Sequence, residues 1–235
     1  MTENVLITGA GRGLGFELSK IFHENQYRVF PLVRNQSSAN KLSHDLKGCY
    51  PIVADVSFDE SISLIKSYLQ SRTHSIDIII NCAGISGQET KFNHVTTDEM
   101  KELFNVHCLG VLRTVQAAYD LLQNSANPRV INISSRLGSL GKVSSGDFTE
   151  GEFSYAYRVA KAAQNMLTVC MDQEMKSMGI HISAIHPGEI KTTMGSGDAD
   201  LTPEEAANQL FFWIKKTSYN NSGTFTDPFK GKLPW

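Results

Sequence analysis

The sequence has no marked excess of either charge and no hydrophobic run long enough to cross a membrane. Its 235 residues carry 22 Lys and Arg against 24 Asp and Glu, which gives a net charge of −2. A nucleic-acid-binding surface needs clustered Lys and Arg, and a membrane-spanning helix needs ~20 apolar residues. The longest apolar runs, such as IDIII at 76–80, are far shorter. We therefore expect neither a nucleic-acid partner nor a membrane partner.

The sequence also lacks the cysteine spacing of a disulfide framework or a zinc site. Its four cysteines, at positions 49, 82, 108 and 170, are spread along the chain without a CxxC pair. Small secreted domains and zinc ribbons depend on closely spaced cysteines. The first strand-like run begins at Val5, so we expect no signal peptide. These absences predict a cytoplasmic protein without a metal site.

What the sequence does contain is a regular alternation of short β-branched runs and helical patterns. The strand-like runs are VLIT (5–8), RVFPLV (28–33), YPIVAD (50–55), IDIIIN (76–81), RVINIS (129–134), HISAIHP (181–187) and GTFTD (223–227). The helical patterns fall near 14–25, 37–47, 59–71, 97–122 and 155–176, and from Thr202 onward. Such alternation is typical of βαβ units, and the nearly continuous apolar strands indicate a parallel sheet covered on both faces. We expect one domain over 1–235, with an α/β doubly wound (Rossmann) fold and a six- to seven-stranded parallel sheet.

Two loop-like stretches rich in Gly, Ser and Asp follow strand-like runs. They are GSLGKVSSGDFTEGEFS (138–154) and TTMGSGDADL (192–201). In an open α/β sheet, ligands bind in the crevice at the carboxyl ends of the strands. We therefore predict that both loops form walls of a site.

The first strand-like run leads into TGAGRGLG (8–15), a glycine-rich turn that opens a helical pattern. Gly9 permits a tight turn, Gly13 lets the backbone approach a phosphate, and Gly15 allows the helix to pack closely on the strand. The helix N-terminus favours the negative charge of a phosphate. No Gly-Lys-Ser/Thr follows, so the turn is not a P-loop. The strand before it and the helix after it favour a dinucleotide site over a plain turn.

Tyr157 and Lys161 lie four residues apart in a helical pattern, so both fall on one face of the helix. The unperturbed pKa of a phenol is about 10, and lowering it to ~7 needs about 4 kcal/mol of preferential stabilisation of the phenolate. A neighbouring ammonium and a cationic nicotinamide ring in a partly desolvated cleft can supply much of that energy. Such a tyrosine is a general acid for carbonyl reduction and a general base for alcohol oxidation. Tyr155 is a rival, but it has no lysine four residues on, which favours packing at the helix start.

Ser135 follows the fifth strand-like run. Its hydroxyl can donate a hydrogen bond to a substrate oxygen as charge develops there. Ser134 alternates to the other face of the strand, so we expect a structural role for it.

These motifs, in this order, resemble the short-chain dehydrogenase/reductase family from end to end. The glycine turn has the spacing TGxxxGxG, NCAG (81–84) stands where the family usually has NNAG, and INISS (131–135) closes the fifth strand-like run. Further on, YRVAK (157–161) has the YxxxK spacing and HPGEIKT (186–192) has the PGxxxT spacing.

The resemblance implies that Ser135, Tyr157 and Lys161 are the catalytic serine, tyrosine and lysine, and that Lys161 also binds the nicotinamide ribose. It further implies a set of cofactor contacts, in which Asp55 and Val56 would flank the adenine. Cys82, in the second position of NCAG, is expected to be a small packing residue. The full set of expected cofactor contacts is Gly9, Arg12, Gly13, Leu14, Gly15, Arg34, Asp55, Val56, Asn81, Ala83, Gly84, Tyr157, Lys161, Pro187, Ile190 and Thr192.

Within that set, the resemblance assigns Asn81 and Ala83 to the ribose. It assigns Ile190 and Thr192 to the nicotinamide amide, with the adjacent Thr193 as an alternative to Thr192.

Cofactor preference is predicted from the charge at the end of the second strand-like run. NAD-specific folds of this type place an Asp or Glu about 20 residues beyond the glycine motif. Here the run ends PLVRN (31–35) without an acid, and Arg34 stands at its tip. Arg12, inside the glycine turn, could join Arg34 in clamping a 2′-phosphate. The alternative is two solvated surface arginines. The pattern predicts NADP(H) in preference to NAD(H).

The stretch FNVHCLG (104–110) departs from the family at one position. The family has an asparagine where this chain has His107, while the flanking phenylalanine, valine and glycine match. By resemblance, that asparagine helps to hold a water in a proton relay from the lysine to solvent. A neutral imidazole donates and accepts hydrogen bonds, so two interpretations stay open: His107 carries protons, or it packs and bonds locally. Asn105 falls two residues too early, and Cys108 is expected to pack without binding a metal.

Together these features predict an oxidoreductase that transfers a hydride between NADPH and a small carbonyl or alcohol substrate. The tripeptide AYR before the lysine and the tail GKLPW resemble the carbonyl-reductase and C-factor-like subgroup. The alternative is a cofactor-binding signalling or regulatory protein with little turnover, although the intact serine, tyrosine and lysine argue against it. A nucleotide-sugar epimerase or dehydratase usually needs a C-terminal domain longer than the ~40 residues after the sixth strand-like run.

The oligomeric state is predicted only indirectly. The helical patterns at 97–122 and 155–176 could pair across a two-fold axis, as they do in relatives, or pack in the core. The first interpretation predicts a homodimer or homotetramer.

Overall fold

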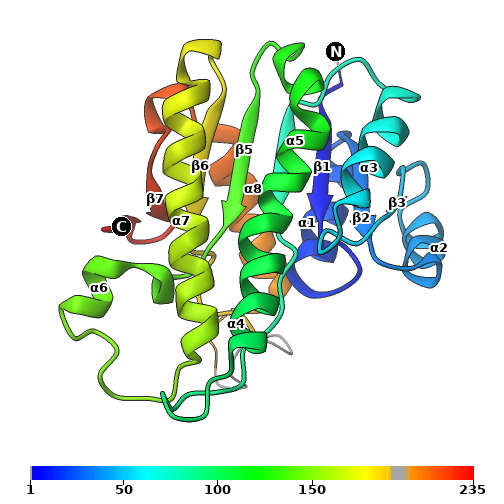
Figure 1. Ribbon diagram of the computed structural model, residues 1–235. Coiled ribbons are helices and arrows are strands. Elements are labelled where there is room, and N and C mark those ends of the chain that lie inside the picture. Colours follow the sequence, from blue (N-terminus) through cyan, green and yellow to red (C-terminus); the bar gives the residue numbers. More distant parts are fainter. Residues whose placement is uncertain (1, 192–198, 200) are drawn as a thin grey trace.

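The computed structural model describes residues 2–191, 199 and 201–235, in which strands and helices alternate along the chain (Figure 1). The strands are β1 (Asn4–Thr8), β2 (Arg28–Val33), β3 (Ile52–Val53), β4 (Ile78–Asn81), β5 (Arg129–Ile133), β6 (His181–Ile185), β7 (Phe225–Asp227) and β8 (Gly231–Lys232). The helices are α1 (Gly13–Glu24), α2 (Gln36–Asp45), α3 (Glu60–Gln70), α4 (Thr97–Phe104), α5 (Gly110–Gln123), α6 (Leu140–Ser144), α7 (Tyr155–Met175) and α8 (Pro203–Lys216). A π-helical turn covers Asn105–Leu109, and 3₁₀ turns cover Arg136–Gly138, Lys176–Met178 and Tyr219–Asn221.

The strands form one sheet in the order β3-β2-β1-β4-β5-β6-β7-β8, which confirms the doubly wound α/β fold. All neighbouring pairs are parallel except β7 and β8, which pair antiparallel through Thr226 with Lys232 and Asp227 with Gly231. The sheet therefore has eight strands, one more than the upper limit predicted from the sequence. The added strand, β8, is two exposed residues long, so it has no apolar pattern by which to recognise it.

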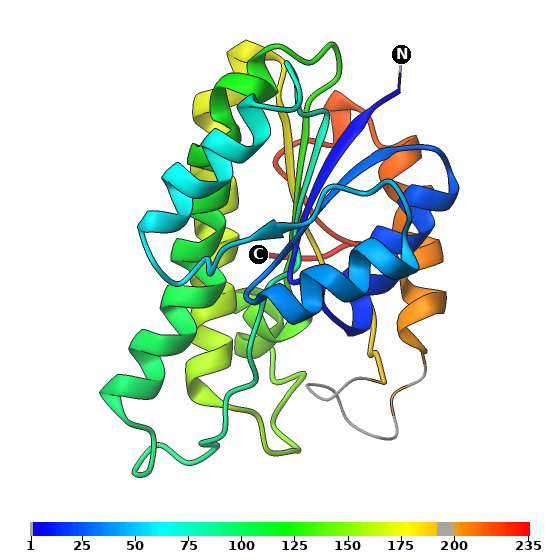
Figure 2. The same cartoon turned by 90° about the vertical axis from the view of Figure 1, so that its right-hand side faces the viewer.

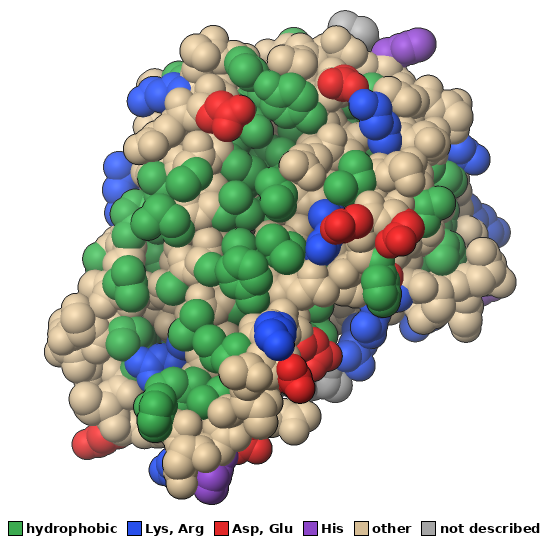
Figure 3. Space-filling model, viewed as in Figure 1, with side chains coloured by type: hydrophobic (Ala, Val, Ile, Leu, Met, Phe, Trp, Pro, Cys, Tyr) green, Lys and Arg blue, Asp and Glu red, His purple; other side chains and the backbone are tan. Residues whose placement is uncertain are grey.

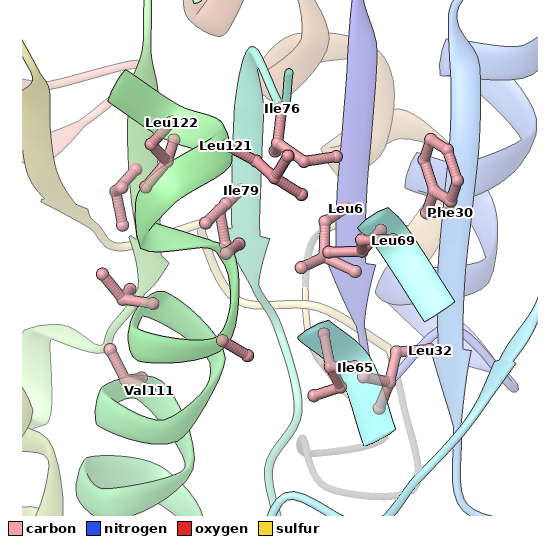
Figure 4. Packing of buried hydrophobic residues seen from close by; sticks show 14 of the residues in the cluster. Leu6, Phe30, Leu32, Ile65, Leu69, Ile76, Ile79, Val111, Leu121 and Leu122 are labelled. Atoms are coloured by element: carbon pink, nitrogen blue, oxygen red, sulfur yellow. The ribbon is translucent and has the colours of Figure 1, made fainter. Parts of the chain in front are cut away.

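Helices cover both faces of the sheet. Figure 2 views the sheet edge-on, with α1 and α8 on one side and α3, α5 and α7 on the other. Successive strand residues point to opposite faces: Leu6 and Ile79 pack in the cluster under α3 and α5 (Figure 4), whereas Ile7 and Ile80 pack under α1 and α8. Burying one such side chain stabilises the fold by about 1.5–3 kcal/mol, so two-sided burial explains why the strands are apolar throughout.

The prediction of one helix over 97–122 was wrong in one respect. α4 and α5 are separated by the π-helical turn Asn105–Leu109, in which the amide of Gly110 donates to the carbonyl of Asn105. Such a turn adds a residue to the helical repeat, so side chains on its two sides no longer follow a regular 100° rotation. Hydrophobic periodicity cannot reveal this, because apolar residues continue through both helices.

The fold places a binding crevice between β1 and β4. The strand order runs outward from these two neighbours in opposite directions, and ligands of doubly wound folds bind at the carboxyl ends of the strands at that point. In the part of the chain that the structure describes, no helix is long and apolar enough to cross a bilayer, and no three His, Cys, Asp or Glu side chains gather as a metal site would require.

Candidate active site

A cavity of about 650 Å³ opens at the expected crevice. It is lined by every predicted cofactor contact except Asn81 and Thr192. Thr192 lies outside the described residues. The structure therefore gathers into one cavity residues that are spread over most of the chain, from Gly9 to Ile190.

The glycine turn forms the wall of this cavity at the start of α1. Gly9 and Gly13 have φ angles of +70° and +55°, a region that favours glycine. A Cβ on Gly9 would lie 2.7 Å from the Cα of Ala83, and one on Gly15 would lie 2.4 Å from the carbonyl oxygen of Gly9. The N-cap residue Arg12 makes no side-chain cap. The first amides of α1 thus remain available, and the cradle fits the phosphates of a dinucleotide.

The loop after β3 borders the same cavity and is held from two sides. The Asp55 carboxylate accepts hydrogen bonds from the amide and hydroxyl of Ser57, at 3.0 and 2.6 Å. Asn105 donates to the carbonyl of Ser57 at 2.9 Å, and Arg113 donates to the carbonyl of Val56 at 3.0 Å and to Asn105 at 2.8 Å. Asn105, to which we gave no role in the site from the sequence, lines the cavity and fixes this loop. Arg113 was missed, although a buried arginine on an apolar helix face is itself a signal.

Arg12 and Arg34 are exposed side chains at the cavity wall. Among the described residues, neither guanidinium forms an ion pair. Ser38, on the first turn of α2, lines the cavity beside Arg34. Arg34 and Ser38 thus give the cavity a positive charge and a hydroxyl just after β2, and β2 itself ends without the carboxylate that binds a ribose diol in NAD-specific folds.

Asn81 lies away from the cavity lining, in a buried polar layer between the sheet and α7. Its amide donates to Asn132 at 2.8 Å, and the amide of Asn132 donates to the Thr168 hydroxyl at 2.9 Å. The Thr168 hydroxyl in turn donates to the backbone carbonyl of Gln164 at 2.8 Å. This chain of bonds fixes the register of α7 against β4 and β5.

The first turns of α7 carry Tyr157 and Lys161 to the inner end of the cavity. Ser154 caps the helix by accepting from the amide of Tyr157 at 3.2 Å. The Lys161 ammonium donates to the carbonyl of Ile133 at 2.7 Å and to the side-chain carbonyl of Gln164 at 3.0 Å. Its nitrogen lies 5.7 Å from the centre of the Tyr157 ring.

Ser135 begins the 3₁₀ turn Arg136–Gly138, which packs directly against α7. A Cβ on Gly138 would lie 2.7 Å from Lys161, so only glycine permits this approach. Asn165 also donates to the carbonyl of Gly138 at 3.1 Å. Ser135 is buried and lies close enough to Tyr157 to affect its pKa, although its neighbour Ser134, not Ser135, lines the cavity. The structure thus brings the serine, tyrosine and lysine together.

Burial dominates the electrostatics of this group. It raises the pKa of Tyr157 to about 12, with the hydrogen bond from Ser135 acting in the opposite direction. Burial also lowers the pKa of Lys161 to about 7. Burial therefore outweighs the effect of the neighbouring ammonium on the phenol pKa. A lowered phenol pKa depends on further positive charge in the cavity.

His107 lies in the π-helical turn and presents the edge of its ring to Tyr157, with the ring centres 5.3 Å apart. Its Nε2 lies 2.8 Å from the carbonyl oxygen and 3.3 Å from the amide of Ile85. The shorter contact favours a donating Nε2–H, which leaves Nδ1 as a buried acceptor without a partner among the described residues. Burial and the nearby Lys161 lower the pKa of His107 to about 3. The imidazole is thus neutral, and suited to accept a hydrogen bond rather than to carry a proton as imidazolium.

The loop over 138–154 contains a feature that the sequence did not predict, the short helix α6. The tail holds this helix: the Ser139 hydroxyl donates to the carbonyl of Pro234, and the amide of Gly141 donates to the carbonyl of Trp235, both at 2.7 Å. Trp235 stacks on Phe225, with ring centres 5.7 Å apart. The tail therefore fixes the loop that follows Ser135. The second predicted wall, 192–201, lies largely outside the described residues.

Comparison with known proteins agrees with this geometry. The family model described as "short chain dehydrogenase" matches residues 3–201. The chain is 32% identical to the C-signal of Myxococcus xanthus over 163 residues, which cover 69% of this chain and 95% of that protein. It is 28% identical to an uncharacterized oxidoreductase of Staphylococcus aureus over 236 residues, which cover 96% of this chain and 97% of that protein.

The crystal structure of an NADPH-bound carbonyl reductase from chicken fatty liver has a TM-score of 0.88 with this chain, at 26% identity. The match covers all of this chain and 99% of that one.

The depressed pKa of Lys161 predicts a pH dependence of stability. Between its folded value of about 7 and its usual value of 10.5, the unfolded chain binds the proton and the folded chain does not, so stability rises with pH. From pH 7 to 9, the free energy of unfolding of the wild type should rise by about 2 kcal/mol relative to Lys161→Met, measured by urea denaturation. Lys176→Met removes an exposed lysine at the end of α7 and should parallel the wild type. Parallel curves for the wild type and Lys161→Met would contradict the lowered pKa of Lys161.

Proposed function

Because this chain belongs to the short-chain dehydrogenase family and is an NAD(P)-binding oxidoreductase of that family, we propose that it reduces small carbonyl compounds with NADPH. In reverse it would oxidise the corresponding alcohols. The observation that carries the proposal is that Tyr157 and Lys161 line one cavity together with the glycine turn of α1, while buried Ser135 lies beside Tyr157. We also propose that residues 1–235 form one cofactor-binding domain and that the protein acts in the cytoplasm.

In this mechanism, bound NADPH supplies the hydride. Ser135 donates a hydrogen bond to the substrate carbonyl oxygen and stabilises the negative charge that develops there. Tyr157 delivers the proton to that oxygen from its hydroxyl. Lys161, with its positive charge in a poorly solvated site, stabilises the resulting phenolate and also binds the nicotinamide ribose. Neutral His107, through Nδ1, holds a water near Lys161 for reprotonation.

The assignment of Tyr157 predicts a large and selective loss of turnover. Tyr157→Phe removes only the hydroxyl, so kcat for carbonyl reduction should fall about 10²- to 10⁴-fold while NADPH binding is retained. Steady-state kinetics over a panel of ketones, aldehydes and quinones, with binding followed by NADPH fluorescence, measures both quantities.

Tyr155→Phe is the matched control, because Tyr155 lies two residues earlier on α7 and is 38% exposed. It should retain the wild-type kcat. A greater loss for Tyr155→Phe than for Tyr157→Phe would contradict the assignment. Tight NADPH binding by the wild type without turnover of any carbonyl would instead favour a cofactor-binding regulatory protein.

The preference for NADPH is supported by the two unpaired arginines at the cavity wall. The double variant Arg12→Ala, Arg34→Ala should lose at least about 100-fold in kcat/KM with NADPH, since each charge-assisted hydrogen bond to a phosphate contributes about 1.5–3 kcal/mol. Its kcat/KM with NADH should stay within about threefold of the wild type. Lys216→Ala, which removes an exposed charge on α8, serves as the control. A clear preference of the wild type for NADH would contradict this proposal.

A homodimer through the face of α4, α5 and α7 is supported by the apolar side chains on it. Figure 3 shows hydrophobic side chains gathered over these helices. Phe104, Val159 and Met166 are 39%, 47% and 61% exposed. Light scattering should give a dimer mass for the wild type and a monomer mass for Met166→Lys, because a charge in an apolar interface is costly. Phe212→Lys, on α8 across the sheet, should remain a dimer. A monomeric wild type would contradict the proposal.

A further inference from the structure

The buried ammonium of Lys161 is held by an acceptor that the family motif does not contain. Gln164, one helical turn after Lys161, is 1% exposed, and Lys161 itself is 4% exposed. The side-chain carbonyl of Gln164 accepts from the ammonium at 3.0 Å, while the carbonyl of Ile133 accepts at 2.7 Å. A lysine ammonium has three N–H groups, so these two carbonyls leave one for the cavity.

Among the residues that the structure describes, the titratable groups that face Lys161 are Tyr157 on α7, Cys82 after β4 and His107 in the π-helical turn. Burial raises the pKa of Tyr157 and of Cys82 to about 12, and lowers the pKa of His107 to about 3. All three are therefore uncharged near neutral pH. Within the described part of the chain, the acceptors of the ammonium are two neutral carbonyls, that of Ile133 on β5 and that of the Gln164 side chain.

The positive charge of Lys161 is thus hydrogen-bonded without being neutralised. An amide acceptor stabilises the ammonium by its dipole and leaves the net charge in place. A carboxylate at the same position would pair with the ammonium and cancel the potential that it exerts on the phenol. An apolar side chain would leave a buried N–H group without an acceptor.

Gln164 is itself held in place by the buried polar layer. Its backbone carbonyl accepts from the Thr168 hydroxyl at 2.8 Å, and Thr168 is tied to Asn132 of β5. These bonds fix the backbone of Gln164, from which the side chain reaches the ammonium, relative to β5.

We propose that Gln164 is a positioning residue for the proton transfer and cofactor binding of this site: its side-chain carbonyl holds Lys161 by one N–H, favours the charged form of the lysine, and leaves one N–H for the cavity. This role rests on the proposed function, in which Lys161 binds the nicotinamide ribose and stabilises the phenolate of Tyr157. Gln164 does not contact the reacting atoms.

Two substitutions with opposite electrostatic effects test the role. Gln164→Glu adds a negative charge beside the ammonium, and Gln164→Met removes the acceptor with little change in shape. The measurement is the dissociation constant of NADPH as a function of pH. The weakening of binding at alkaline pH that the wild type shows and Lys161→Met lacks reports the deprotonation of Lys161, and we call it the Lys161 limb. Gln173→Glu makes the same change on the exposed face of α7. Thermal unfolding shows that each variant is folded.

The midpoint of the Lys161 limb should move up by about one pH unit in Gln164→Glu and down by about one unit in Gln164→Met. Gln173→Glu should leave it unchanged. A merely structural role would weaken binding in both variants without moving the midpoints in opposite directions, and that result would overturn the proposal. Failure of the wild type to bind NADPH would overturn the proposed function, and the role of Gln164 with it.

Turnover gives a second, independent readout. In alcohol oxidation, Gln164→Glu cancels the charge next to Tyr157, so the apparent pKa of the general base should rise by about one unit and the rate at pH 7 should fall about tenfold. An unchanged pH profile in Gln164→Glu, with a wild type that turns over, would also overturn the proposal.

Discussion

The ammonium of Lys161 is buried where β5, α7 and the π-helical turn meet, and the arrangement of the site depends on how it is held. Transferring a charge from water into a protein interior is costly unless hydrogen bonds compensate. Here Ile133 and Gln164 provide them, at 2.7 and 3.0 Å. The same packing that buries the ammonium, with Gly138 against Lys161 and Asn165 bonded to the carbonyl of Gly138, also fixes the turn that begins at Ser135. One constraint thus orders all three catalytic candidates.

This constraint also gives the cavity its electrostatic character. With Tyr157 and Lys161 both buried, the tyrosine holds its proton more tightly and the lysine holds its proton less tightly than either would in water. The phenol is therefore inactive as a base in the chain alone. At the other end, the uncapped N-terminus of α1 and the arginines at positions 12 and 34 attract anionic phosphates. Binding of the oxidised cofactor and activation of the tyrosine as a base would be coupled in this account, because the nicotinamide ring of NADP⁺ is positively charged.

The fold, the glycine turn and the Tyr-Lys pair could be predicted from the residues, because strand periodicity, glycine spacing and the Tyr-Lys separation are local signals. Most of the other cavity contacts were predicted by resemblance to the family. The features that were missed depend on contacts between distant segments. The π-helical turn cannot be recognised from an uninterrupted apolar pattern, and it changed the interpretation of Asn105, which fixes the loop after β3. Asn81 was assigned by resemblance to the ribose, whereas the structure places its side chain in the polar layer under α7. Gln164 carried a usable signal: a polar residue three positions after Lys161 falls on the same buried helix face.

The central claim is that burial keeps Tyr157 protonated until a cationic cofactor enters. The most direct test is a spectrophotometric titration of the phenol of Tyr157, taken as the difference between the wild type and Tyr157→Phe, with and without saturating NADP⁺. The account predicts a pKa well above the usual value of 10 without cofactor, and a decrease of at least about two units when NADP⁺ is bound. A phenol that titrates near neutral pH in the protein alone, or that does not respond to NADP⁺, would contradict it.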